Sequence, residues 1–157
     1  MAVKPIPDGY HTVTPYLVVK GAASAIDFYK KAFGATELMR MAGPDGRVGH
    51  AEIRIGDSPI MLADEFAEMG FKGPDSLGGS AVGILLYVKD ADMLFNQAVA
   101  AGGKVSRPVK DQFYGDRSGT LTDPFGHVWT IATHTKDVSP EEMHKGAEAA
   151  MKEQGGG

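Results

Sequence analysis

Residues 14–35 decide the fold, and they read TPYLVVKGAASAIDFYKKAFGA. Apolar side chains fill 12–19 as they do in a strand, with Tyr16 and Val18 on one face. From 22 to 33 apolar residues recur every three or four positions, which is the stripe of an amphipathic helix. Gly34 stands where such a helix ends. The stretch therefore predicts a strand followed by a helix.

Further strands follow this strand and helix, and the same order then returns. The segment 49–55 alternates, with His50, Glu52 and Arg54 on one face, and it follows a turn signal at 43–46. A glycine-rich linker precedes the second series, whose helix begins at 91 and ends at the glycines 102–103. The expected strands after the first are 36–42, 49–55 and 58–64, and then 82–89, 104–109, 113–122 and 127–134.

The two series are an internal repeat. A shift of 69 residues places Leu17 on Leu86 and Gly34 on Gly103, so that helix stops and strands match at one offset. The repeat predicts an α+β fold of tandem βαβββ units. The expected organisation is a single domain, 1–157, made of unit one at about 11–64, a linker at 65–79, unit two at about 80–135 and a C-terminal helix at about 139–153.

The C-terminal helix begins with a capping box. Ser139 is its N-cap, a proline takes the first helical position and Glu142 follows three residues after the serine. Two interpretations of its apolar stripe stay open: an arm that contacts a second copy, or a helix that packs on its own domain. The final glycines, 155–157, are expected to fray. The stripe consists of Met143, Ala147, Ala150 and Met151.

Composition excludes several classes of protein. The 157 residues carry 16 Lys and Arg against 20 Asp and Glu, a net charge of −4, which gives no field to neutralise phosphates. Nucleic acid is therefore not an expected partner. The sequence has no cysteine, so it has neither disulfides nor a thiolate site. No apolar run approaches the ~18 residues of a membrane span, and 1–11 lacks the core of a signal peptide. We expect a cytoplasmic protein that contacts no membrane.

Together the repeat and four segments resemble a known superfamily over roughly 11–135. The segments are 14–35, 46–65 (GRVGHAEIRIGDSPIMLADE), 111–117 (DQFYGDR) and 123–134 (DPFGHVWTIATH). The chain resembles the vicinal oxygen chelate superfamily of glyoxalase I, bleomycin-resistance and fosfomycin-resistance proteins and extradiol dioxygenases, and is most similar to its PhnB-like branch. The resemblance implies that the tandem units form curled mixed sheets, each of them half of a cup. In the enzymes of the superfamily the concave face of this cup binds a divalent ion.

The family's metal-ligand positions correspond here to residues that suit no divalent ion. Carried over through the repeat, these positions are Thr14, Met61, Gly83 and Thr130. The metal enzymes place His, Glu or Gln there, because borderline and hard divalent ions need imidazole or carboxylate donors. We therefore expect no metal or other cofactor and no glyoxalase chemistry by the usual route.

An alternative metal or proton-transfer site is the pair His50 and Glu52. These residues lie two positions apart on one strand and, by parity, line the cup. The alternative interpretation is a polar wall in which the two bond each other. His134 has the parity of Thr130 and is a possible third member at the rim. The other histidines are expected to be solvated: His11, His127 and His144.

Aromatic residues around the empty ligand positions favour binding. Tyr16 and Tyr87 have cup parity, and Phe113 and Tyr114 precede Arg117 in the segment 111–117. Aromatic walls with a few polar groups hold flat organic ligands. The opposing interpretation is that half of these aromatics are core. Trp129, by contrast, is expected in the core.

The first hypothesis is therefore a small-molecule-binding protein of the bleomycin-resistance kind, acting as a homodimer on an aromatic or planar ligand. The alternatives are an enzyme, glyoxalase-like or dioxygenase-like, with a displaced site at His50 and Glu52, or a structural or interaction protein without a ligand. The proposed ligand-binding set is Thr14, Tyr16, His50, Glu52, Met61, Tyr87, Phe113, Tyr114, Arg117 and Thr130.

Overall fold

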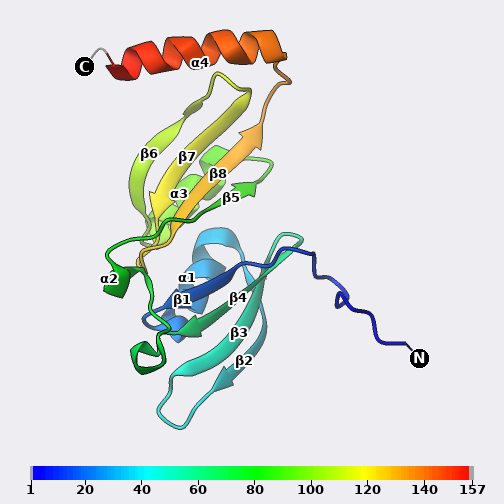
Figure 1. The fold of residues 1–157 in the computed structure, drawn as a ribbon, viewed down its shortest axis with the longest axis vertical. Helices are drawn as coiled ribbons and strands as arrows, with labels where there is room; N and C mark the ends of the chain where they lie inside the picture. Colours follow the sequence, from blue (N-terminus) through cyan, green and yellow to red (C-terminus); the bar gives the residue numbers. More distant parts are fainter. Residues whose placement is uncertain (1, 156–157) are drawn as a thin grey trace.

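The computed structural model describes residues 2–155 and contains the βαβββ unit twice, followed by a helix (Figure 1). The first unit consists of β1 (Tyr16–Val19), α1 (Ala22–Phe33), β2 (Thr36–Ala42), β3 (Val48–Ile55) and β4 (Ser58–Asp64). The second consists of β5 (Gly83–Tyr87), α3 (Ala91–Ala101), β6 (Lys104–Asp111), β7 (Asp116–Thr122) and β8 (Val128–His134). The tandem α+β architecture predicted from the repeat is confirmed.

Each unit forms its own four-stranded mixed sheet. The strand order is β1-β4-β3-β2 in the first sheet and β5-β8-β7-β6 in the second. In both, the first strand pairs in parallel with the last, and the remaining neighbours are antiparallel. One face of each sheet packs on its helix and the other is left open. In Figure 1 the two units lie end to end along the long axis of the molecule.

The repeat extends to the residues that fasten each helix to its sheet. Asp64, at the end of β4, accepts hydrogen bonds of 2.8 Å from the backbone N–H groups of Gly21 and Ala22. Thr133, which is 69 residues later, accepts one of 2.9 Å from the N–H of Ala91. Both side chains satisfy amide groups at a helix start that have no partner within the helix.

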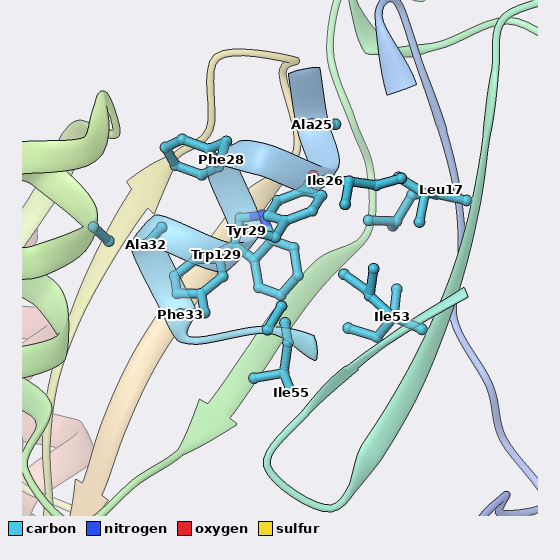
Figure 2. Close-up of a cluster of buried hydrophobic side chains, with 14 of the residues drawn as sticks. Leu17, Ala25, Ile26, Phe28, Tyr29, Ala32, Phe33, Ile53, Ile55 and Trp129 are labelled. Atoms are coloured by element: carbon cyan, nitrogen blue, oxygen red, sulfur yellow. The ribbon is translucent and has the colours of Figure 1, made fainter. Parts of the chain in front are cut away.

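One aromatic core joins the two units (Figure 2). Helices α1 and α3 contact each other, and the rings of Tyr29 and Phe33 on α1 lie 5.3 and 4.7 Å from that of Trp129 on β8. Trp129 is fully buried, as predicted. The buried carboxylate of Asp123 accepts hydrogen bonds from the Tyr29 hydroxyl (2.6 Å) and from Nε1 of Trp129 (2.9 Å). The units therefore share a core and not only a linker.

The segments outside the units differ in part from the sequence-based expectation. The linker contains a 3₁₀ turn, η1 (Ala67–Met69), and a short helix, α2 (Pro74–Leu77). The strand expected at 113–122 begins only at Asp116, because 112–115 form a tight turn in which the N–H of Gly115 bonds to the carbonyl of Gln112. No helix within residues 2–155 is long and apolar enough to cross a membrane.

The C-terminal helix, α4 (Pro140–Gly155), lies across the end of the second sheet in Figure 1. Ser139 Oγ accepts the N–H of Glu142, as its predicted capping role requires. Within this fully described helix no residue is buried, and Met151 is 73% exposed. A Cβ on Gly146 would lie 2.6 Å from the ring of Phe113, so α4 rests closely on that ring. The expectation that 155–157 fray falls largely on Gly156 and Gly157, outside the described residues.

Candidate functional site

The first open face is a row of functional side chains across the first sheet. Strand register places Tyr16 beside Met61, Met61 beside Glu52 and Glu52 beside Met39. In the next row Met41 is the partner of His50. Because side chains alternate along a strand, all of these point away from α1. We call this set the first open face: Tyr16, Met39, Met41, His50, Glu52 and Met61.

A chain of hydrogen bonds connects the polar groups of this face. The Tyr16 hydroxyl lies 2.9 Å from Nδ1 of His50, whose Nε2 lies 3.3 Å from Oε1 of Glu52. The hydroxyl of Tyr10, from the segment before β1, donates to Oε2 of Glu52 at 2.6 Å. That bond, with a smaller contribution from His50, lowers the pKa of Glu52, although burial opposes it. Glu52 is therefore a carboxylate at neutral pH.

The second open face is the side of the second sheet that points away from α3, and it carries a different chain of hydrogen bonds. The buried carboxylate of Asp116 accepts a 2.7 Å hydrogen bond from the Tyr87 hydroxyl and lies 2.7 Å from Nδ1 of His134. Nε2 of His134 lies 2.8 Å from Asp137, just beyond the sheet. Asp137 and Asp116 raise the pKa of His134. Burial acts to raise the pKa of Asp116, but the bonds from His134 and Tyr87 outweigh it and keep that pKa low.

Of the predicted binding set, the structure brings together only subsets. Tyr16, His50, Glu52 and Met61 share the first open face, whereas Tyr87 and Thr130 lie on the second. Phe113 and Tyr114 lie in the turn before β7, with ring centroids 5.2 Å apart, beside α4. Thr14 lies before β1, where its hydroxyl is 3.5 Å from the carbonyl of His11.

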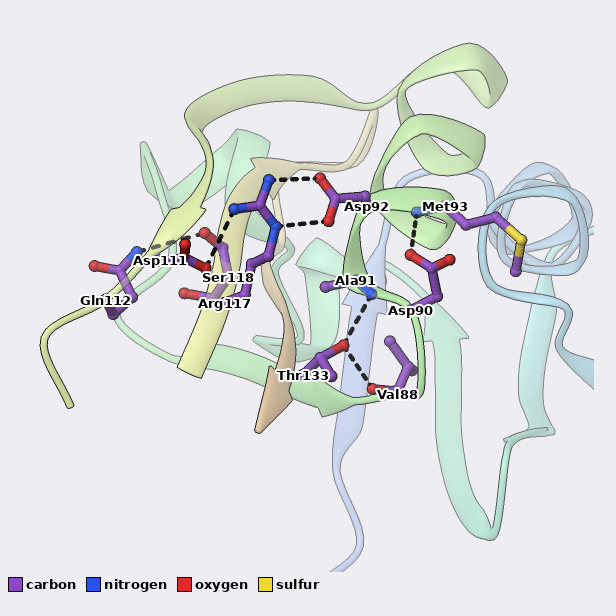
Figure 3. Close-up of polar contacts among 10 residues, drawn as sticks. All are labelled: Val88, Asp90, Ala91, Asp92, Met93, Asp111, Gln112, Arg117, Ser118 and Thr133. Atoms are coloured by element: carbon purple, nitrogen blue, oxygen red, sulfur yellow. Dashed lines mark hydrogen bonds and ion pairs between the residues drawn. The ribbon is translucent and has the colours of Figure 1, made fainter. Parts of the chain in front are cut away.

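Arg117 requires a correction because it lies on the helix-covered side of the second sheet (Figure 3). Its register partner Thr133 faces α3, and the guanidinium pairs with Asp92 on α3 at 2.7 Å and with Asp111 at 3.2 Å. Parity explains the placement, since Arg117 follows the open-face residue Asp116 by one position. Arg117 therefore forms an ion pair that connects β7 to α3, and it does not line either open face.

The histidines expected to be solvated divide into two groups. His11 and His144 are exposed. Nε2 of His127, however, lies 3.0 Å from the carbonyl oxygen of Val18, so this histidine connects the second unit to β1. The turn at 123–126 carries it toward the first unit, which no local sequence pattern indicates.

The family's metal-ligand positions do not fit a divalent ion in this fold. Met61 offers a thioether and Gly83 no side chain, while Thr130 Oγ1 lies 3.0 Å from Thr120 Oγ1 and is engaged there. Within residues 2–155, no three His, Asp or Glu side chains are grouped as a metal site would require. Hydroxyl and thioether oxygen and sulfur are poor donors for Zn, Ni, Fe or Mn compared with imidazole and carboxylate.

A groove runs between β1 and β5, the two edge strands that begin the units. Its volume is about 610 Å³, within the range of small-molecule pockets. Tyr16 lines it and is 48% exposed, so the groove adjoins the first open face. Its other apolar walls include Val13, Pro15, Leu77, Val82 and Leu85.

Sequence reasoning missed several residues of these faces. Met39 and Met41 were predicted only as members of the strand 36–42 and not as residues of an open face. Their spacing of two nevertheless places both on one face of that strand. Tyr10 and Asp137 carried no signal, because each lies outside a strand and reaches its carboxylate or histidine partner only through the tertiary fold.

Comparison with known proteins identifies relatives of the whole fold. The protein Rv0887c of Mycobacterium tuberculosis is 47% identical over 148 residues, covering 92% of this chain and 85% of its own. A solved structure from Arabidopsis thaliana, the product of At5g48480, is 31% identical with a TM-score of 0.65, covering 78% of this chain and 98% of that one. TioX from Micromonospora sp. ML1 is 25% identical with a TM-score of 0.63, covering 79% and 98%.

A PhnB protein from Bacillus cereus shares the fold, with a TM-score of 0.63 at 19% identity, covering 78% of this chain and 99% of that one. The model of one family matches residues 10–131, which include the first βαβββ unit and the second as far as Ile131 in β8. The chain therefore belongs to the glyoxalase/bleomycin resistance protein/dioxygenase superfamily.

Proposed function

We propose that the protein binds a small aromatic or planar molecule on its first open face and the adjoining groove. The observation that carries this proposal is the hydrogen-bonded chain of Tyr16, His50 and Glu52, laid out on an exposed sheet face. Orienting polar groups beside apolar walls are what small-molecule sites consist of. The proposed activity is of the bleomycin-resistance kind, in which the protein binds its ligand without chemical change.

The apolar part of this face suits a flat ring. The Tyr16 ring is tilted at 38° to His50 with centroids 5.5 Å apart, so both present π surfaces to a ligand. Methionine side chains flank them, and thioethers adapt to irregular shapes and contact aromatic rings favourably. Glu52 adds a negative charge, which favours a ligand with a cationic or hydrogen-bond-donating group.

A second copy of the chain is part of this proposal. A single chain leaves residues of both open faces exposed, among them Tyr16 and Tyr87, and its sheets have edge strands, among them β1 and β5, which invite pairing. We propose that the cup is completed at or near the interface between the two copies, so that open-face residues of both units, including Tyr87, contribute to it. Light scattering at micromolar concentration should give twice the chain mass of 16.6 kDa. A particle of one chain mass would contradict the assembly.

The binding proposal is tested by a thermal-shift screen of aromatic natural products and antibiotics. Hits on the wild type should lose most of their shift in Tyr16→Ala and part of it in Tyr87→Ala. Met151→Ala, an exposed apolar residue on α4, is the matched control and should retain the full shift. If no compound shifts the wild type, or if hits shift Tyr16→Ala equally, the face is not the site.

We also propose that the protein needs no divalent metal and acts in the cytoplasm, which suits a chain without cysteine. Protein purified without an affinity tag should carry no stoichiometric Ni, Zn, Fe or Mn. It should not turn over the hemithioacetal of methylglyoxal and glutathione with these ions added, because no chelate polarises the substrate carbonyl. One metal per chain surviving dialysis, or enzyme-like turnover, would overturn this.

A second candidate function is proton transfer by His50 and Glu52. The 3.3 Å contact between them favours it, since an ionised carboxylate can orient the imidazole that would transfer the proton. The reactions in question would be glyoxalase-like isomerisation or dioxygenase-like chemistry. Turnover of a bound hit that depends on pH and disappears in His50→Ala would favour this function over simple binding.

A further inference from the structure

We propose that Met39, Met41 and His50 form a binding site for a soft monovalent cation, Cu(I) or its analogue Ag(I). Two thioethers and one imidazole make up a donor set that suits Cu(I) and excludes hard ions. The site is distinct from the family's metal positions, and it does not depend on the proposed organic ligand.

Register brings the three donors within reach of one ion. Met41 is the cross-strand partner of His50, and such pairs have Cβ atoms about 4.5–5.5 Å apart. Met39 lies two residues before Met41 on the same face and is diagonal to His50, at about 7–8 Å. Met61 is the partner of Glu52 on the other side of β3, across that strand from Met39 and Met41, so it is not counted among the three donors.

The exposure of the two thioethers suggests a ligand. Met41 is 57% exposed on the open side of a strand, where its apolar surface gains little from the fold. Met39 is half-buried beside it. Three of the eight methionines of the chain lie on this one sheet face, whereas none of its histidines other than His50 does.

His50 is held as metal-ligating histidines usually are. Its Nδ1 lies 2.9 Å from the Tyr16 hydroxyl, which can donate or accept and so supports either tautomer. Its Nε2 makes only a 3.3 Å contact to Glu52, at the long end of hydrogen-bond distances, and can exchange it for an ion. The acidic side chain of Glu52 lies beside the imidazole, where it favours a bound cation.

The test is a titration of the full chain with Ag(I) in chloride-free buffer. It is followed by the NMR signals of ¹³C-labelled methionine methyl groups. We expect one equivalent to bind and to shift Met39 and Met41, leaving Met93 and Met151 in place. Bathocuproine competition should confirm one equivalent of Cu(I).

Variants assign the donors. The double variant M39L/M41L should bind no equivalent, since leucine keeps the size but removes both sulfurs. Met93→Leu and Met151→Leu, at similarly exposed sites on α3 and α4, are the matched controls and should bind as wild type. Tyr16→Phe should weaken binding by about 10–100-fold, as loss of an outer partner of a ligating histidine does.

Three outcomes would overturn the site: no Ag(I) binding by the wild type, binding that M39L/M41L retains, or equal loss in Met93→Leu. Circular dichroism of each variant shows that it is folded. A failed thermal-shift screen with intact Ag(I) binding would reject the organic ligand and leave the cation site, so the two proposals fail separately.

Discussion

The two units share a fold and a covered face but not an open face. On the open face of the first sheet, one row of cross-strand neighbours consists of Tyr16, Met61 and Glu52. The equivalent row of the second sheet consists of Leu85, Thr130 and Thr120. The first face is thus aromatic, thioether-bearing and acidic at its centre. The second has hydroxyl groups at its centre and an Asp–His chain at its end.

The covered faces show why the units differ most on their open sides. Ile60 and Trp129 occupy equivalent positions, and both are buried against the helices. A substitution there leaves a cavity or a clash that costs several kcal/mol, so these positions must stay apolar. Open-face residues escape this constraint and can diverge toward different chemistry. The comparison teaches that the residues of this protein can diverge most freely on the faces that the helices do not cover.

The largest expected difference between the units is in how much stability comes from the side chain that bonds the start of each helix. Asp64 bonds three amide groups, including that of Val48 at 2.7 Å, whereas Thr133 bonds one. Asp64→Ala should lower the free energy of unfolding by about 3–5 kcal/mol, because each buried amide left unpaired costs about 1–3 kcal/mol. Thr133→Val should cost about 1–2 kcal/mol. Urea unfolding measures both.

Asp64→Asn is the milder variant for this comparison, because asparagine keeps one acceptor oxygen. Its loss of unfolding free energy should fall between those of Asp64→Ala and Thr133→Val. A larger loss in Thr133→Val than in Asp64→Ala would mean that the second unit, and not the first, depends more on its cap.

The next effect distinguishes the second open face by its response to pH. Because Asp137 and Asp116 raise the pKa of His134, protonated His134 stabilises the folded chain. This contribution is fully present below the ordinary histidine pKa of about 6.5 and is lost as the pH rises through the raised pKa. The stability difference between wild type and His134→Gln should therefore shrink as the pH increases.

Asp137→Asn sharpens this prediction by removing the larger cause of the shift. An NMR titration of His134 should show a lower pKa in this variant than in the wild type. If the stability gap of His134→Gln instead widens with pH, the aspartates do not hold an imidazolium on this face.

The smallest effects compare the tyrosines that donate to a carboxylate on each face. Tyr10→Phe should raise the pKa of Glu52, and Tyr87→Phe should raise that of Asp116, because each removes a hydrogen bond to the ionised form. The loss of stability in Tyr10→Phe should stay below about 1 kcal/mol, since the pair is partly hydrated. Carboxyl NMR titration measures both pKa shifts. If the pKa of Glu52 is the same in Tyr10→Phe as in the wild type, Tyr10 does not donate a hydrogen bond to Glu52 in solution.

Local patterns in the sequence determined most of the fold and part of the site. The helical stripe of 22–33, the alternation of 49–55 and the shift of 69 residues predicted both units, because amphipathic periodicity records which face each element buries. Parity likewise placed His50 and Glu52 on one face, and the donor types at Thr14, Met61, Gly83 and Thr130 argued against a divalent ion.

Only the tertiary structure decided which elements share a face and what their side chains touch. It placed Tyr10 on Glu52 and Asp137 on His134, turned Arg117 toward α3, and separated Tyr16 from Tyr87 onto two sheets. These pairings join residues from different elements, and their positions depend on how the two units pack through Tyr29 and Trp129. Periodicity is a property of one segment, so it says which way a side chain points but not which side chain it meets.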